Sequence, residues 1–177
     1  MIGYLAVETR EPLGYFGGIL ITDRFGLPVE FRHTLAVRPT KLQRALYGNA
    51  LDRYVRAVVI TERLVEGVQH EPAIILVADP LLVGDGPVPI GYLSDSGVDP
   101  VGAVGHAEPF DGASRGVLLQ VRAGEAPMRL VTEAPVHLYP QIARALTEAA
   151  ETMDITEPMS RVRAAVGLLA SGDVAAA

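Results

Sequence analysis

The sequence predicts a single α+β domain with a mainly antiparallel sheet built from hairpins, covered by an early amphipathic helix and two C-terminal helices. Short β-branched segments punctuated by Gly and Pro open the chain, a long amphipathic pattern follows them, and two further helical patterns close it. Strict alternation of strands and helices is absent, which argues against a doubly wound nucleotide-binding fold. We expect one domain over residues 1–172 and a frayed, Ala-rich tail over 173–177.

The first elements form a predicted hairpin. Residues 2–7 and 16–22 are rich in β-branched and aromatic side chains, as strands usually are. A tight turn at 23–26, in which Gly26 supplies a positive φ, leads into an alternating segment at 29–33. These features indicate consecutive antiparallel strands.

The next element is the amphipathic helix. Thr40 and Gln43 have the spacing of a capping box, so the helix should begin at Lys41. One side of the helix over residues 41–58 is predicted to rest on a core. That side carries Leu42, Leu46, Ala50, Leu51, Tyr54, Val55 and Val58. A second, short helix is expected near residues 61–68.

The middle of the chain should complete the sheet. Residues 73–78 are continuously apolar and end at Asp79, which is typical of a buried central strand. Short strands are expected near residues 90–93 and 101–105, because a long structureless loop is unusual in a compact domain. A second hairpin is expected from segments 116–122 and 128–133.

Two helices are expected to close the fold. The first covers about residues 136–153, and the second begins after Ile155 and runs toward Leu169. Thr156 and Pro158 have the types and positions of an N-cap and an early helical proline. This last helix carries an apolar stripe of Met159, Val162, Val166 and Leu169. Such a stripe packs either on its own sheet or, as a partner helix, on another subunit.

Composition excludes several classes of protein. The 177 residues include no cysteine, so disulfides, thiolate zinc sites, iron–sulfur clusters and cysteine nucleophiles are impossible. A hydrophobic content of 49% argues against a disordered chain. The net charge of −6 argues against a protein that coats nucleic acid with its whole surface.

The N-terminus and the excess of arginine over lysine indicate where the protein is located and what kind of genome encodes it. No basic start or long apolar run indicates a signal peptide or a spanning helix, so the cytoplasm is the expected location. Lys41 is the sole lysine among 15 basic residues. We interpret the excess of arginine as the codon bias of a GC-rich, bacterial genome.

Charge is segregated along the chain. Residues 24–56 carry seven basic side chains against Glu30 and Asp52, on an otherwise acidic protein. A basic patch can meet an acidic protein surface or a nucleic-acid backbone. The residues expected to make such contacts are Arg38, Lys41, Arg44, Arg53 and Arg56. The alternative is that these arginines pair with the domain's own carboxylates.

Catalytic motifs of high specificity are absent from the sequence. His106 and Glu108 have the His-x-Glu spacing of zinc deaminases, but the cysteines that those sites need are missing. A mixed metal site from His106, Glu108 and Asp111 remains chemically possible, and Asp79 at a strand end is the best single active-site candidate. No Gly-x-Ser-x-Gly elbow or phosphate-binding loop occurs. We therefore predict no catalytic residue, no metal and no cofactor.

These observations favour a non-catalytic cytoplasmic accessory or scaffold subunit that acts through protein–protein contacts, with self-association into an oligomer. Excess apolar content and the stripe on the last helix support that hypothesis. The first alternative is a nucleic-acid-associated factor that uses residues 24–56. The second is a hydrolase or metal-dependent enzyme near Asp79, His106 and Asp111.

Overall fold

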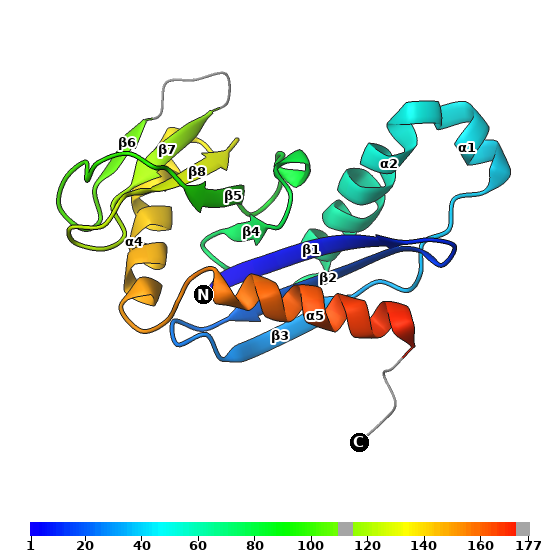
Figure 1. The fold of residues 1–177 in the computed structure, drawn as a ribbon, viewed down its shortest axis with the longest axis horizontal. Helices are drawn as coiled ribbons and strands as arrows, with labels where there is room; N and C mark the ends of the chain where they lie inside the picture. Colours follow the sequence, from blue (N-terminus) through cyan, green and yellow to red (C-terminus); the bar gives the residue numbers. More distant parts are fainter. Residues whose placement is uncertain (110–114, 173–177) are drawn as a thin grey trace.

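A computed structural model describes residues 1–109 and 115–172, and Asp111 and the tail 173–177 lie outside the described residues. Among the described residues, one 8-stranded sheet has the order β3-β2-β1-β4-β5-β8-β7-β6 (Figure 1). Its strands are β1 (Ile2–Arg10), β2 (Gly14–Thr22), β3 (Pro28–His33), β4 (Ile75–Val77), β5 (Ile90–Asp95), β6 (Ala107–Pro109), β7 (Gly116–Leu119) and β8 (Met128–Thr132).

Helices fill most of the remaining chain. A continuous helical segment connects β3 to β4 and consists of α1 (Lys41–Tyr47), the 3₁₀ turn η1 (Gly48–Ala50), α2 (Leu51–Arg53), the π-helix η2 (Tyr54–Glu62) and α3 (Arg63–Gly67). The C-terminal part holds α4 (Tyr139–Ala150) and α5 (Glu157–Ser171). Two short 3₁₀ turns are η3 (Pro80–Leu82) and η4 (Val136–Leu138).

The α+β class is confirmed, but the sheet is mixed. β1 is parallel to β4 and β4 is parallel to β5, whereas the strands on both flanks pair antiparallel as predicted. The long helical segment carries the chain from β3 past β2 and β1, which is the crossover that parallel strands need. Sequence patterns showed this helix but not where the next strand would enter the sheet.

Buried side chains form two cores, one on each face of the sheet. Along β1, Tyr4 and Ala6 belong to the core that contains residues of α4 and α5. Leu5 and Val7 belong to the other core, with residues of α2, η2 and α3. Successive strand residues point to opposite faces, so the helices cover both faces of the sheet.

The start of the long helical segment projects beyond the sheet (Figure 1). The predicted capping box is present, because Thr40 and Gln43 each bond the other's backbone N–H. The apolar side of α1 nevertheless packs on nothing, with Leu42 67% exposed and Leu46 72% exposed. Only from Leu51 onward does the segment rest on the core. We call residues 41–53 the helical arm.

Other local predictions differ at their boundaries. Residues 101–105 form no strand, and the short strand β6 lies just beyond them. Thr156 does not cap α5, because its hydroxyl instead donates to the Asp154 carboxylate at 2.8 Å. No helix among residues 1–109 and 115–172 is long and apolar enough to cross a membrane.

Two adjacent glycines in β2 allow helices to approach both faces closely. A Cβ on Gly17 would lie 2.2 Å from Cγ2 of Ile60, which belongs to η2. A Cβ on Gly18 would lie 2.7 Å from Cγ2 of Val166, which belongs to α5. Both distances are far below van der Waals contact, so any side chain here must displace a helix.

The edge strand β3 is tied to the end of the helical segment through Glu30. Its carboxylate accepts hydrogen bonds from the backbone N–H groups of Gln69 and His70, from the His70 ring and from Arg32. Burial raises the pKa of Glu30, but these hydrogen bonds outweigh it and lower the pKa to about 2. The carboxylate therefore stabilises the fold only while it is ionised.

Replacing Glu30 with glutamine is expected to lower the free energy of unfolding by about 1–2 kcal/mol at pH 7. Because the folded-state pKa lies below its ordinary value of 4.5, this contribution is present above pH 4.5 and disappears as the pH falls toward 2. Urea unfolding of both proteins between pH 2 and pH 7 measures the difference. Glu71→Gln, at an exposed neighbour, should change little, and a pH-independent gap would contradict the prediction.

Candidate functional site

The site lies where the order of the strands reverses. From β1 the chain turns to β2 on one side, whereas β4 and β5 extend the sheet on the other side. In open sheets with parallel strands, ligands bind outside the carboxyl ends of the strands at such a point. Here the parallel ladder between β1 and β4 ends with the Ala78 N–H, which donates to the Leu5 carbonyl at 3.0 Å. Asp79 follows directly.

Three oxygen atoms surround the guanidinium of Arg56 at this position. Arg56 Nη2 lies 2.9 Å from Oδ2 of Asp79 and 3.4 Å from the Val7 carbonyl oxygen, and Nη1 lies 3.8 Å from Oδ2 of Asp52. The Arg56 side chain is 19% exposed and that of Asp79 is 24% exposed. We call Asp52, Arg56 and Asp79 the arginine–aspartate cluster.

The π-helix η2 carries Arg56. Its wide turns close backbone bonds between residues five apart, and such turns occur frequently at functional sites. The Thr61 hydroxyl also donates to the Arg56 carbonyl at 2.8 Å, which secures the same turn. Nearby, burial and then the Asp52 carboxylate raise the pKa of the Tyr15 hydroxyl.

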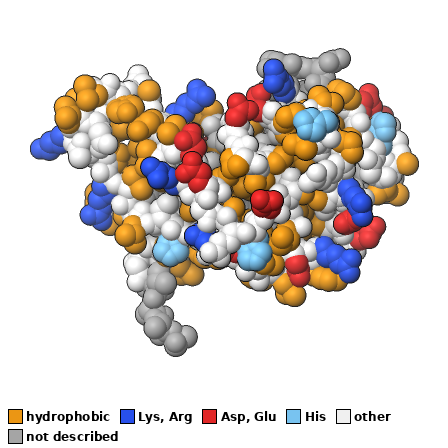
Figure 2. All heavy atoms as spheres, turned by 180° about the vertical axis from the view of Figure 1, so that it is seen from behind, with side chains coloured by type: hydrophobic (Ala, Val, Ile, Leu, Met, Phe, Trp, Pro, Cys, Tyr) orange, Lys and Arg blue, Asp and Glu red, His pale blue; other side chains and the backbone are white. Residues whose placement is uncertain are grey.

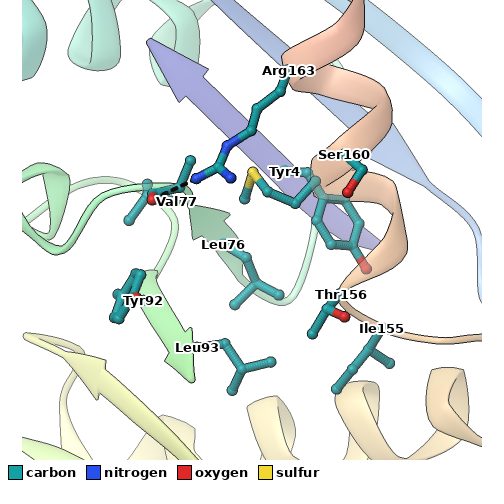
Figure 3. A pocket seen from close by; sticks show the side chains of 11 residues that line it. Tyr4, Leu76, Val77, Tyr92, Leu93, Ile155, Thr156, Ser160 and Arg163 are labelled. Atoms are coloured by element: carbon teal, nitrogen blue, oxygen red, sulfur yellow. Dashed lines mark hydrogen bonds between the residues drawn. The ribbon is translucent and has the colours of Figure 1, made fainter. Parts of the chain in front are cut away.

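A second arginine reaches the same strand end from the other face of the sheet. Arg163, on α5, donates from Nη2 to the Ala78 carbonyl at 3.1 Å (Figure 3). It stands beside a cavity of about 280 Å³ between α5, β4 and β5. Hydrophobic side chains and Thr156, Ser160 and Tyr92 surround this cavity, whose lining is Tyr4, Leu76, Val77, Ala78, Tyr92, Leu93, Ile155, Thr156, Met159, Ser160 and Arg163.

The predicted basic residues occupy three kinds of environment. Arg56 was expected in a basic contact patch, but it belongs to the arginine–aspartate cluster and its side chain is mostly buried. Arg38 donates to the Leu13 carbonyl at 2.8 Å and so joins the β1–β2 turn. Lys41, Arg44 and Arg53 are exposed on the helical arm and form no ion pair with any described carboxylate.

Asp79 and His106 do not converge. His106 precedes β6 at the far edge of the sheet, four strand spacings from β4, or about 19 Å at about 4.8 Å per strand. Its ring lies 3.8 Å from the Glu108 carboxylate, and both side chains are exposed. Asp111 lies outside the described residues. Of the predicted enzyme site near Asp79, His106 and Asp111, the two described members therefore do not share a site.

The predicted partner stripe on the last helix faces the sheet of its own chain. Val162 and Val166 are buried in the core beneath α5, and Met159 packs against the same core. Leu169 is half-buried. The stripe follows helical periodicity, which cannot distinguish an intramolecular contact from an intermolecular one.

Sequence reasoning missed Arg163 and the true position of Arg56. Arg163 lies on the polar side of a helix, and no spacing linked it to Asp79. Arg56 was identified as basic, but only the crossover to β4 brings it to Asp79. The signal that was available was Asp79 at the end of a buried apolar strand.

The described carboxylates do not form a ready metal centre. Clustered carboxylates commonly hold the divalent ions that metal-dependent enzymes use. No group of three or more His, Asp or Glu side chains within the described ranges could hold a metal ion. The Arg56 guanidinium lies between Asp52 and Asp79, 3.8 Å from the first carboxylate and 2.9 Å from the second. These residues do not fit a metal ion in the arrangement observed.

The fold and site thus define an α+β domain with helices on both faces of a mixed sheet and charged groups at the switch point. Endonuclease V from Streptomyces avermitilis has a similar structure, with a TM-score of 0.57 and 15% sequence identity over 98% of this chain and 82% of that chain. The structure of human ENDOV matches with a TM-score of 0.47 and 12% identity, over 98% of this chain and 85% of that chain. No family model and no curated protein matches the sequence.

The first likeness shows a shared fold and corrects the functional prediction. The structure from Streptomyces is that of an endonuclease, an enzyme. The prediction of a non-catalytic accessory or scaffold subunit is therefore wrong, and the comparisons give no support to protein partners. The error arose because apolar content was interpreted as contact surface, whereas two separate cores on one sheet account for most of it.

Proposed function

We propose that this protein is a nucleic-acid-processing enzyme that hydrolyses phosphodiester bonds at the carboxyl end of β4, beside Val7 of β1. The observation that carries the proposal is the ion pair of Arg56 and Asp79 at the switch point of a fold shared with an endonuclease, where Arg163 binds the preceding Ala78 carbonyl from the other face. Carboxylates suit proton transfer, and arginines suit the binding of phosphate oxygens. The arginine–aspartate cluster and Arg163 together supply the two kinds of group that this reaction needs.

Each residue has a role in the proposed reaction. Arg163 is exposed and uses one Nη for the Ala78 carbonyl, so its other N–H groups are available to a phosphate oxygen. Asp79 accepts a proton from the attacking water, whose oxygen bonds to phosphorus as the P–O bond to the sugar breaks. The departing sugar oxygen takes a proton from solvent. Arg56 orients Asp79 through the 2.9 Å contact between Nη2 and Oδ2.

The helical arm supports binding of the polymer beside this site. Lys41, Arg44 and Arg53 supply unpaired positive charge, and Tyr47 stacks on Tyr54 with ring centroids 4.3 Å apart. Figure 2 shows hydrophobic and basic side chains gathered on this projecting part, at the upper left of that view. Basic grooves combined with aromatic rings are typical of surfaces that bind single-stranded nucleic acid.

The direct test is cleavage of end-labelled single-stranded and duplex DNA and RNA by the purified protein, separated on denaturing gels. We expect strand breaks that increase with time and enzyme concentration. The matched negative control is the Asp79→Asn variant purified in parallel, because a contaminating nuclease would cut equally in both. Absence of cleavage of every substrate, with and without added Mg²⁺, would refute the proposal.

Removing two arginines from the helical arm is expected to weaken nucleic-acid binding and reduce its salt dependence. For Arg44→Ala/Arg53→Ala, the slope of log Kd against log salt should become shallower by about 1.4 on a single strand, at about 0.7 per phosphate contact. Fluorescence anisotropy over a range of salt concentrations measures this slope.

The matched control is Arg115→Ala/Arg144→Ala, which removes the same charge from surface ion pairs elsewhere on the protein. That control should shift affinity slightly through net charge alone. Equal slopes for the two double variants would show that the helical arm does not contact phosphate groups.

A further inference from the structure

The arginine–aspartate cluster has the ligands of a cation site. Oxygen atoms from Asp52, Asp79 and the Val7 carbonyl all lie within 3.8 Å of the Arg56 guanidinium, and they come from α2, the residue after Ala78 and β1. Carboxylate and carbonyl oxygens are the ligands that Mg²⁺ and Mn²⁺ prefer. The position between them already holds a positive charge, the guanidinium of Arg56.

Arg56 is held firmly in this position. Its side chain is 19% exposed, it contacts both carboxylates, and it extends from a π-helix whose face packs on β2 against Gly17. A divalent ion bound at the same oxygens would either lie next to the guanidinium or displace it from two carboxylates. The first arrangement places like charges together, and the second leaves a mostly buried arginine without its partners.

We propose that Arg56 is the resident cation of this site and that it excludes divalent metal ions from the place between Asp52 and Asp79. The catalytic part of this inference rests on the proposed function. If no metal ion takes part, hydrolysis should persist in excess EDTA. The exclusion of metal ions from the site can be tested without nucleic acid, because binding of Mn²⁺ alone measures it. Removing the guanidinium should open a metal site that the wild-type protein lacks.

The experiment is titration of each protein with Mn²⁺, with free Mn²⁺ measured by electron paramagnetic resonance. The wild-type protein and Asp79→Asn should bind Mn²⁺ equally weakly. Arg56→Ala should bind one Mn²⁺ at least tenfold more tightly than wild type, and Arg56→Ala/Asp79→Asn should lose this gain. Arg56→Lys, which keeps a cation, should behave like wild type.

Arg56→Gln provides a second route if the alanine variant does not fold, and circular dichroism identifies folded variants. Tight Mn²⁺ binding by wild type that disappears in Asp79→Asn would overturn the inference, and so would failure of both folded, neutral variants to gain Mn²⁺. Absence of cleavage by wild type under all conditions would refute the proposed function but leave these binding results interpretable. Cleavage by wild type that requires added metal would refute the catalytic part of the inference.

Discussion

Replacing Asp79 with asparagine is expected to reduce the rate of phosphodiester cleavage by at least about 100-fold. General base catalysis contributes about 10² to 10⁴ in rate, and the asparagine amide cannot accept the proton of the attacking water. The loss should fall on kcat, because the carboxylate acts in the transition state more than in substrate binding. Single-turnover and steady-state cleavage by both proteins give kcat and KM separately.

Asparagine is the informative replacement because it preserves the local fold. Oδ1 of Asp79 accepts from the Leu81 N–H at 2.9 Å and so begins the η3 turn, and an asparagine carbonyl can accept the same bond. Affinity for nucleic acid should stay the same or increase, since a negative charge has been removed. Asp99→Asn, at an exposed loop position, is the matched control. Activity of Asp79→Asn within threefold of wild type would show that Asp79 is not the base.

Replacing Gly17 with valine is expected to destabilise the protein by about 3 kcal/mol, a large fraction of the stability of a typical domain. The new Cβ would lie 2.2 Å from Cγ2 of Ile60 and 3.0 Å from Cδ1 of Leu64, and both side chains are buried. The helical segment must therefore move away from β2 or the strand must shift. Chemical unfolding monitored by circular dichroism measures the loss.

Three further variants identify the cause. Gly84→Val inserts the same side chain where a Cβ meets nothing within 4 Å, so it should change stability by less than about 0.5 kcal/mol. Ile60→Ala removes the clashing methyl group, and Gly17→Ala should cost less in that background than in wild type. Additive effects of Gly17→Ala and Ile60→Ala would show that these positions do not compete for space.

Packing at Gly17 also affects the position of the arginine–aspartate cluster. Ile60 and Arg56 belong to the same π-helix, one packed against β2 and the other contacting Asp79. A helix displaced from β2 would carry the guanidinium away from the strand end. The Gly17→Ala protein should therefore cleave more slowly than wild type even under conditions in which it is fully folded.

The sequence by itself determined the local elements. The strands of the first hairpin, the turn at Gly26, the capping box at Thr40 and both C-terminal helices follow from periodicity and from backbone preferences of single residues. The sequence also singled out Asp79, because an acidic residue directly after a buried strand lies at the end of that strand, where the sheet meets solvent. These features depend on neighbours a few residues apart, so a single chain is enough to recognise them.

Only the tertiary structure decided how these elements combine. The strand order, the parallel entry of β4 beside β1 and the presence of helices on both faces depend on contacts between residues far apart in sequence. The same contacts turn Arg56 from an apparent surface charge into the partner of Asp79 and bring Arg163 to the same strand end. Charge patterning counts such arginines but cannot pair them, because pairing energy depends on distances in space that periodicity does not encode.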